Sequence, residues 1–307
     1  MHRVLITGGT GSMGRRLVAK LLSKGFVVSV IALPGDRGIE DAKKAGASVI
    51  EADVASSETL AGVCKDVQTV YHLAAVILAP GREEIFTRVN LNGTKNMLSE
   101  ARLSGVRHFI HVSSASVVYP NPNAYSLSKR ASEELVKKSG LPYTIIRPTL
   151  AYEDGGAAEF MHYVNFLKRY PVVPLIGGGY ALKRPVHVDD IVDGFASLAG
   201  NTKAINKTYN FSGGDTLSLR EMSILLLSHI GCKKPVLTIP VSFCRLAAWL
   251  LNLFSPWLVK EPLFTWQTIS GVTQNANLDN SDAVRDLGFC PRTFKEGLET
   301  LKSLKKK

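Results

Sequence analysis

Residues 7–14 read TGGTGSMG and lie between an apolar run that ends at Ile6 and apolar residues at helical spacing that begin with Met13. This pattern predicts a strand, a tight glycine turn and a helix. Glycine lets an anion approach backbone N–H groups closely, and a helix N-terminus adds partial positive charge. We therefore expect a pyrophosphate cradle formed by Gly8, Gly11, Ser12, Met13 and Gly14.

Strand-like and helix-like segments alternate through the first half of the chain. The expected strands are 3–7, 26–33, 48–52, 69–74, 108–113 and 143–147. This alternation predicts an α/β fold of βαβ units with a parallel sheet. Beyond about residue 148 the pattern changes to loops and separated helices, so we expect a second lobe to begin there.

Composition narrows the class of protein. The chain has 307 residues, of which 45% are hydrophobic, so it can bury a large core. Its four cysteines are scattered and lack metal-ligand spacing, so we expect neither a disulfide nor a metal site. The first strand begins almost at Met1, so we expect a cytoplasmic location. The net charge of +11 suits an anionic ligand, and the basic 302–307 tail lacks the aromatic residues typical of nucleic-acid binding.

The end of the second predicted strand bears on the choice of cofactor. Ala32 and Leu33 stand where a carboxylate usually accepts the ribose hydroxyls of NAD. Arg37 could contact the 2′-phosphate of NADP, whereas Asp36 could bind the ribose. Both could equally be turn-formers. The sequence gives a slight preference for NADP.

The next two strand ends are expected to line the same crevice. Asp53 and Val54 close the third strand, and Leu73, Ala74 and Ala75 close the fourth. Small residues there admit a flat ring, and a carboxylate can accept an adenine amino proton. A helix cap at Asp53 and simple packing of the alanines are the alternatives.

A catalytic candidate follows in YSLSK, residues 125–129. Tyr125 and Lys129 are four apart and share one helix face, so the ammonium can favour the phenolate. Ser113, Ser114 and Ser116 end the fifth strand beside the same crevice, where a hydroxyl could hold a substrate carbonyl. Together these residues predict acid/base chemistry on an alcohol or carbonyl.

The motifs TGGTGSMG, YHLAA, VNLNGTKN, HVSSAS, YSLSK, IIRPT and RPVHVDD together resemble the extended short-chain dehydrogenase/reductase family, in its epimerase/dehydratase-like and hydroxysteroid-dehydrogenase-like branch. The resemblance implies an α/β fold with a Rossmann-like doubly wound parallel sheet and a smaller substrate lobe. The NAD(P)-binding domain is expected over 1–147 and the mainly substrate-binding lobe over 148–307, with 186–212 returning to the first domain. The resemblance implies Tyr125 as acid/base, Lys129 as its electrostatic partner and ribose ligand, and Ser114 as the carbonyl-orienting hydroxyl. It also implies cofactor contacts from the residues Ser113, Asn90 and Pro148. A different alignment would put Ala115 in the serine position, and Ser113 and Ser116 stay open.

The substrate lobe gives fewer signals. IIRPTLAY is similar to the hydroxysteroid-dehydrogenase-like and ketone-reductase-like branches rather than to nucleotide-sugar enzymes. The apolar 243–258 segment predicts a buried lid or pocket helix, with a peripheral membrane contact as the alternative. In KRPVHVDDIV, Arg184 is expected to face an anionic group or a carboxylate, and Asp189 to cap a helix; we discount a metal site at His187, Asp189 and Asp190.

Three hypotheses follow. The first is an NAD(P)-dependent oxidoreductase that interconverts a secondary alcohol and a ketone on an apolar small-molecule substrate through Ser114, Tyr125 and Lys129. The second is a nucleotide-sugar epimerase or dehydratase. The third is a non-catalytic cofactor-bound scaffold or membrane-associated protein. By analogy with the resembling family, we expect a homodimer.

Overall fold

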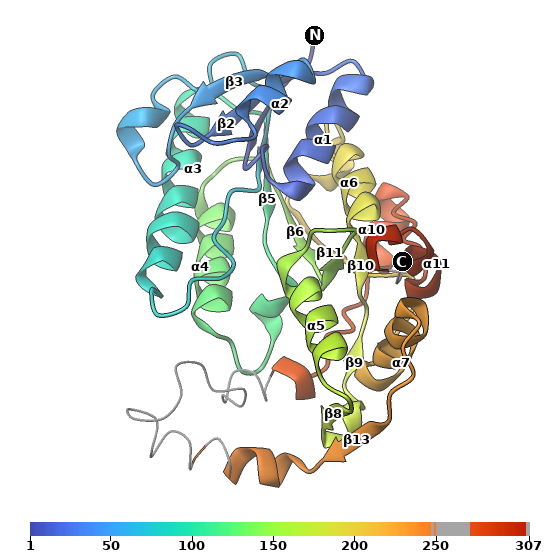
Figure 1. The fold of residues 1–307 in the computed structure, drawn as a ribbon. Coiled ribbons are helices and arrows are strands. Elements are labelled where there is room, and N and C mark those ends of the chain that lie inside the picture. Colours follow the sequence, from blue (N-terminus) through green and yellow to red (C-terminus); the bar gives the residue numbers. More distant parts are fainter. Residues whose placement is uncertain (247–248, 250–270, 305–307) are drawn as a thin grey trace.

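The computed structural model describes residues 1–246, 249 and 271–304, and its centre is a seven-stranded sheet (Figure 1). The strand order is β11-β6-β5-β4-β1-β2-β3, and every neighbouring pair is parallel. The strands are β1 (Arg3–Thr7), β2 (Val27–Ala32), β3 (Ser48–Glu51), β4 (Thr69–His72), β5 (His108–Val112), β6 (Tyr143–Pro148) and β11 (Lys207–Phe211). The predicted doubly wound fold is confirmed. The order reverses between β1 and β4, where such folds bind ligands at the carboxyl ends of the strands.

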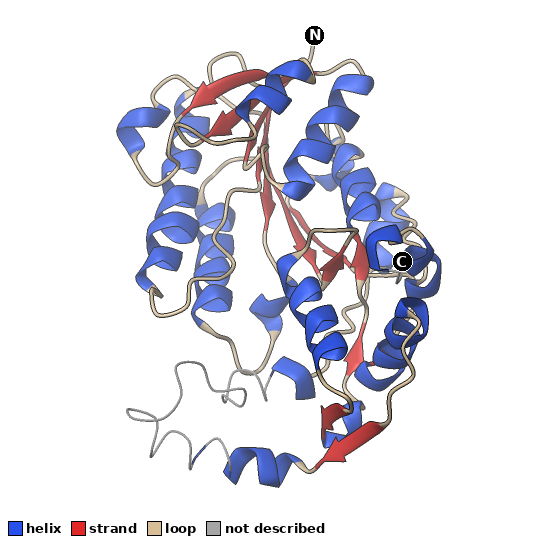
Figure 2. Cartoon of the chain, viewed as in Figure 1, coloured by secondary structure: helices blue, strands red, loops and turns tan. Residues whose placement is uncertain are grey.

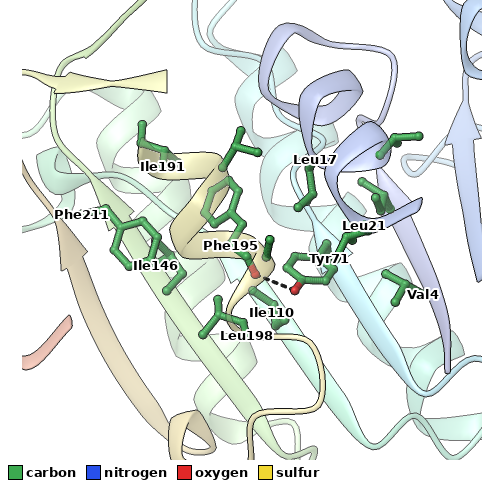
Figure 3. Packing of buried hydrophobic residues seen from close by; sticks show 14 of the residues in the cluster. Val4, Leu17, Leu21, Tyr71, Ile110, Ile146, Ile191, Phe195, Leu198 and Phe211 are labelled. Carbon is green, nitrogen blue, oxygen red and sulfur yellow. Dashed lines mark hydrogen bonds between the residues drawn. The ribbon is translucent and has the colours of Figure 1, made fainter. Parts of the chain in front are cut away.

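Helices cover both faces of this sheet, so its strands are apolar on both sides. On one face lie α1 (Ser12–Ser23) and α6 (Val188–Ala196); on the other lie α3 (Gly93–Leu103) and α4 (Ala124–Lys138). Figure 3 shows the α1/α6 face, where the buried Tyr71 hydroxyl donates to the Phe195 carbonyl at 2.7 Å. Side chains alternate along a strand, so the neighbour of Tyr71, His72, points to the α3/α4 face.

The second half of the chain forms a separate core beside the sheet. Its strands form three two-stranded sheets rather than one large sheet. The pair formed by 173–176 and 236–239 is seen well apart from the main sheet in Figure 2. The three pairs are β7 (Ala151–Tyr152) with β10 (Val186–His187), β9 (Leu182–Lys183) with β12 (Leu217–Ser218), and β8 (Val173–Ile176) with β13 (Val236–Ile239). The helices α5 (Ala158–Arg169), α7 (Leu219–Ile230) and α11 (Phe294–Glu299) pack around them. The remaining elements are α2 (Ile39–Lys44), α10 (Ser281–Leu287), η1 (Ser57–Leu60), η2 (Phe86–Asn92), η3 (Ala115–Val118), η4 (Gly177–Gly179), η5 (Thr202–Ala204) and η6 (Lys302–Leu304).

Two helix starts lie in this half. Ser218 and Glu221 form a capping box at the start of α7, in which each side chain accepts the other residue's backbone N–H. The cap of α6 was predicted wrongly, because His187 is the capping residue and its Nδ1 atom accepts the Asp189 N–H at 3.2 Å. The boundary at residue 147 stays a prediction, since β11 pairs with β6 across it.

The apolar 243–258 segment falls largely outside the described residues. Its described members Phe243, Leu246 and Trp249 are 63%, 55% and 56% exposed. The burial that we expected is therefore wrong for these three residues. Within the helical stretch 241–246, Cys244 faces into the protein, whereas Phe243 and Leu246 face outward. None of the helices in the described ranges is long and apolar enough to span a bilayer.

Candidate active site

The glycine turn lies tightly against the end of β4. Gly8 has a φ of +70°, and a Cβ built there would stand 2.9 Å from the Ala74 nitrogen. A Cβ at Gly14 would stand 2.1 Å from the Gly8 carbonyl oxygen, inside any allowed contact. The Gly11 N–H donates to that same carbonyl at 3.2 Å, which closes the turn at the start of α1. This shape fits a pyrophosphate lying against backbone N–H groups.

Ser12, at the first residue of α1, has a partner that the sequence did not indicate. Its hydroxyl donates to the buried carboxylate of Glu153, which follows β7. Arg16 also donates to Glu153, at 2.7 Å, and forms an ion pair with Asp189. The helix that starts at the glycine turn is thereby tied to the second half of the chain. Met13 packs against the core of the α1 face.

A cavity of about 360 Å³ opens beside the turn, at the end of β2. Its lining includes Thr10, Arg15, Asp36 and Arg37. Both carboxylate oxygens of Asp36 are engaged: one accepts from the Thr10 hydroxyl at 2.8 Å and the other from the Gly38 N–H at 2.7 Å. The two arginines are exposed side chains that face this cavity from α1 and the β2–α2 turn. Arg15 was missed by the sequence argument.

The end of β4 lies beside the glycine turn, whereas the segment after β3 bonds within its own turn and packs near α3. The Ala74 N–H donates to the Thr7 hydroxyl oxygen at 3.1 Å, so the 73–75 segment lies beside the glycine turn. Asp53 accepts from the Ala55 N–H at 2.9 Å within the turn before η1, whose N-cap is Ser56, so Asp53 bonds a turn rather than a helix start. Val54 packs near Gly93.

Three further predicted residues are Asn90 in η2, Ser113 directly after β5 and Pro148 at the carboxyl end of β6. Asn90 is fully buried and clamps both backbone groups of Val76. The Ser113 hydroxyl is buried without a hydrogen-bond partner in the described part of the chain. Pro148 ends β6 opposite Phe211.

Tyr125 and Lys129 lie on successive turns of α4. Asn123 caps this helix by accepting the Ser126 N–H at 2.9 Å. Lys129 is only 1% exposed, and Tyr125 packs edge-on against Phe86 with ring centroids 6.1 Å apart. Burial lowers the pKa of Lys129 to about 8, opposed by the nearby Glu133 carboxylate.

The pKa of Tyr125 shifts in the direction opposite to our expectation. Burial, and then the charge of Glu159 on α5, raise it to about 12, while the Ser114 side chain acts to lower it. Desolvation of the phenolate is therefore the dominant effect within the protein. Tyr125 keeps its proton at neutral pH, which makes it an acid toward a carbonyl oxygen.

The geometry also describes the serine segment. Ser114 is the N-cap of η3, and its Oγ lies 3.2 Å from the Ser116 nitrogen and 3.0 Å from the Ser116 Oγ. Ala115 is buried and carries no hydroxyl. Of the candidates in this segment, Ser114 is the one whose side chain acts on Tyr125.

Arg184 and Asp190, which belong to the KRPVHVDDIV segment, form contacts within the protein. Arg184 donates to the Gly213 and Leu278 carbonyls and to the Asn280 side chain at 3.0–3.3 Å, so it holds loops together and forms no ion pair with a carboxylate of the described residues. Asp190 pairs with Arg292 at 2.7 Å. Over the described ranges, no group of histidine, cysteine and acidic side chains has the arrangement of a metal site.

Comparison with known proteins is consistent with this site. The model of the NAD dependent epimerase/dehydratase family matches residues 4–212. The 4-hydroxy-2-methyl-3-oxo-4-farnesyl-3,4-dihydroquinoline-1-oxide ketoreductase of Stigmatella aurantiaca is 25% identical, over 98% of this chain and 96% of the relative. The UDP-glucose 4-epimerase of Vibrio cholerae is 26% identical, over 96% of this chain and 93% of its own.

Solved structures agree on the fold. The dTDP-glucose 4,6-dehydratase DesIV of Streptomyces venezuelae, solved with NAD and TYD bound, superposes with a TM-score of 0.77 at 23% identity, covering 98% of this chain and 96% of DesIV. Because the family model covers more than half of the chain, and the glycine cradle fits the pyrophosphate of a dinucleotide, the assignment follows. The chain belongs to the NAD dependent epimerase/dehydratase family of NAD-dependent enzymes.

Proposed function

We propose that this protein is an NAD(P)-dependent oxidoreductase that interconverts a secondary alcohol and a ketone on a largely apolar small molecule. The observation that carries the proposal is that Tyr125 and the buried Lys129 lie on successive turns of α4, with Ser114 beside Tyr125, at the end of the sheet where the glycine turn lies. A bound nicotinamide supplies hydride transfer. The protein's own residues position the substrate and move one proton.

The roles of these residues follow from their chemistry. The Ser114 hydroxyl donates a hydrogen bond to the ketone oxygen and orients it. Tyr125 gives its proton to that oxygen as the carbon is reduced, and takes it back in the reverse reaction. The Lys129 ammonium stabilises the phenolate that Tyr125 becomes. In this proposal the cofactor is held by the turn residues Gly8, Gly11, Ser12, Met13 and Gly14, by the strand ends Asp53, Val54, Leu73, Ala74 and Ala75, and by Asn90, Ser113, Pro148 and Lys129.

Two features support an apolar substrate. Ile77 and Leu78 directly follow the 73–76 segment and are each 50% exposed, an apolar surface next to the cofactor-lining residues. Arg184, which could have met a diphosphate, is already bonded within the lobe. The ketoreductase named above acts on a farnesylated ring, and this likeness points in the same direction.

The test is removal of the phenolic hydroxyl. Tyr125→Phe should lower kcat about a thousandfold and leave the cofactor Kd within threefold, because general acid catalysis contributes about 10²–10⁴. Tyr163→Phe is the matched control, since its hydroxyl bonds Ser223 within the substrate lobe. Full activity of Tyr125→Phe would reject the mechanism and favour a non-catalytic role.

A nucleotide-sugar epimerase or dehydratase is the second candidate, and the likeness to UDP-glucose 4-epimerase supports it. Thermal-shift screens with saturating cofactor distinguish the two. A ligand at a hundredfold excess over Kd stabilises by about 2.7 kcal/mol, which is measurable. Lipophilic ketones should raise the Tm; a rise with nucleotide sugars alone would replace our proposal with this one.

We further propose a preference for NADP. The engaged carboxylate of Asp36 and the guanidinium groups of Arg15 and Arg37 around the 360 Å³ cavity suit a 2′-phosphate better than a bare ribose. Arg15→Ala and Arg37→Ala should each weaken NADP binding about tenfold, because a hydrogen bond to a charged group contributes about 1.5–3 kcal/mol. NAD binding should change little. Equal losses for NAD and NADP would contradict the preference.

A further inference from the structure

A chain of buried polar side chains runs beneath the site on the α3/α4 face of the sheet. It consists of Thr7, His72, Thr94, Asn90 and Ser128, none more than 7% exposed. These residues come from the ends of β1 and β4, from the η2–α3 segment and from α4. Buried polar groups are expected to be fully paired, so the direction of every hydrogen bond can be worked out.

Thr94 fixes the proton on His72. The Thr94 hydroxyl lies 2.6 Å from the Asn90 carbonyl oxygen, which can only accept, so its single proton is used there. The His72 Nε2 atom is 3.1 Å from the same hydroxyl oxygen and must therefore carry a proton and donate it.

Thr7 fixes the other ring nitrogen. The Thr7 Oγ1 atom accepts the Ala74 N–H and lies 2.8 Å from the His72 Nδ1 atom. With Nε2 protonated in a neutral ring, Nδ1 is the acceptor and the Thr7 hydroxyl donates to it. A second proton on His72 would displace that donor. It would also place a positive charge close to the Lys129 ammonium on α4. The His111 ring on β5 lies on the same side, with its centroid 5.7 Å from that of His72.

Asn90 transmits the arrangement to the reacting residues. Its Oδ1 accepts the Val76 N–H at 2.8 Å, which fixes the amide orientation, and its Nδ2 donates to the Val76 carbonyl and to the Ser128 hydroxyl. Ser128 in turn donates to the Tyr125 carbonyl at 2.7 Å. The 73–76 segment and the catalytic helix are thus held by one asparagine.

We propose that His72, locked as the neutral Nε2–H tautomer, is a positioning residue that sets the catalytic helix α4 in register with the glycine turn through Thr94 and Asn90. This inference rests on the proposed function, because Tyr125 is the group that it positions. A small displacement of a reacting group costs catalysis much more than it costs stability. The chain should therefore affect kcat more than folding.

The first experiment does not depend on activity. Long-range ¹⁵N–¹H correlation spectra of the imidazoles, with His72→Phe used for assignment, should show His72 as the neutral Nε2–H tautomer from pH 5 to 9. An Nδ1–H tautomer, or titration of His72 within that range, would overturn the proposal. If the protein reduces no ketone, the proposed function fails, and this spectrum still judges the hydrogen-bond chain.

The second experiment uses matched variants. Thr94→Val removes the hydroxyl at nearly constant shape and should lower kcat about tenfold, whereas Thr94→Ser keeps the hydroxyl and should stay within twofold of wild type. Tyr71→Phe is the stability control, because it loses one buried hydrogen bond on the opposite face of the sheet (Figure 3). Equal kcat for Thr94→Val and Thr94→Ser, or an equal loss in Tyr71→Phe, would reduce the chain to a merely structural feature.

Discussion

The two sides of the candidate site are built in different ways. The cofactor side consists of strand ends in the seven-stranded sheet and the residues beside them. Thr7, His72 and Asn90 are fully buried there. The Thr7 hydroxyl bonds the His72 ring, and Asn90 accepts the N–H of Val76 in the segment after β4. The substrate side consists of α5 and short strand pairs, and the side chain of Glu159 there is exposed although its charge acts on Tyr125. A continuous sheet fixes backbone positions, whereas short elements leave specificity to individual side chains. Substitutions should therefore be far less tolerated on the cofactor side.

Substitution in the glycine turn should have the largest effect. Gly14→Ala places a Cβ 2.1 Å from the Gly8 carbonyl oxygen and 2.7 Å from the Gly9 Cα, and neither backbone atom can move cheaply. We expect a loss of cofactor affinity of at least about a hundredfold, because overpacking and backbone shifts cost about 1–3 kcal/mol or more. Isothermal titration calorimetry with NAD and NADP measures it.

Gly11→Ala is the control for that experiment. Gly11 lies in the same turn, has an ordinary φ, and its added Cβ would meet the Gly8 oxygen at 3.4 Å, an ordinary contact. Its cofactor Kd should change much less than that of Gly14→Ala. Equal effects of the two substitutions would show that the close approach at Gly14 does not determine the turn.

The sheet also carries three buried histidines, and these predict a loss of stability in acid. Burial lowers the pKa of His72 to about 3 and of His108 to about 4, and holds that of His111 well below its usual range. Their pKa values are lower in the folded chain, so the unfolded chain binds more protons below pH 6.5. Stability is therefore lost as pH falls, by about 1.4 kcal/mol per pH unit for each histidine.

Urea unfolding at pH 7, 6 and 5 measures this slope, and His111→Phe tests its origin. Both His111 nitrogens lack a hydrogen-bond partner within the described residues, so phenylalanine loses no bond there. The variant should be at least as stable as wild type at pH 7 and should have a shallower acid slope. An unchanged slope would assign the acid sensitivity to other groups.

The sequence allowed more to be predicted on the cofactor side than on the substrate side. Strand alternation and the TGGTGSMG turn predict the sheet, because period and glycine placement are local signals. The hydrogen-bond chain was not predicted, although Thr7 and His72 stand inside the motifs that were quoted, because pairing across strands far apart in sequence leaves no local pattern. The roles of Ser114, Tyr125 and Lys129 and the homodimer stay predictions.

On the substrate side, the errors have a physical cause. Arg184 was expected to meet a ligand or a carboxylate, yet its donors are used by the Gly213 and Leu278 carbonyls and by Asn280. These partners lie up to 96 residues away in the chain. Charge and spacing alone cannot indicate such contacts. Glu153 was missed for the same reason, since its partners Ser12 and Arg16 belong to the other half of the chain.

The smallest effect is expected at Glu159, and it would show that the two sides communicate. The carboxylate of Glu159 raises the pKa of Tyr125, so Glu159→Gln should lower that pKa and move the alkaline limb of kcat/KM for ketone reduction to lower pH. We expect a shift of less than about one pH unit, because the Glu159 side chain is exposed and solvent screens its charge. Glu134→Gln is the control, since Glu134 pairs with Lys137 on the exposed face of α4. A limb that moves to higher pH, or that moves equally in the control, would mean that α5 does not influence the proton on Tyr125.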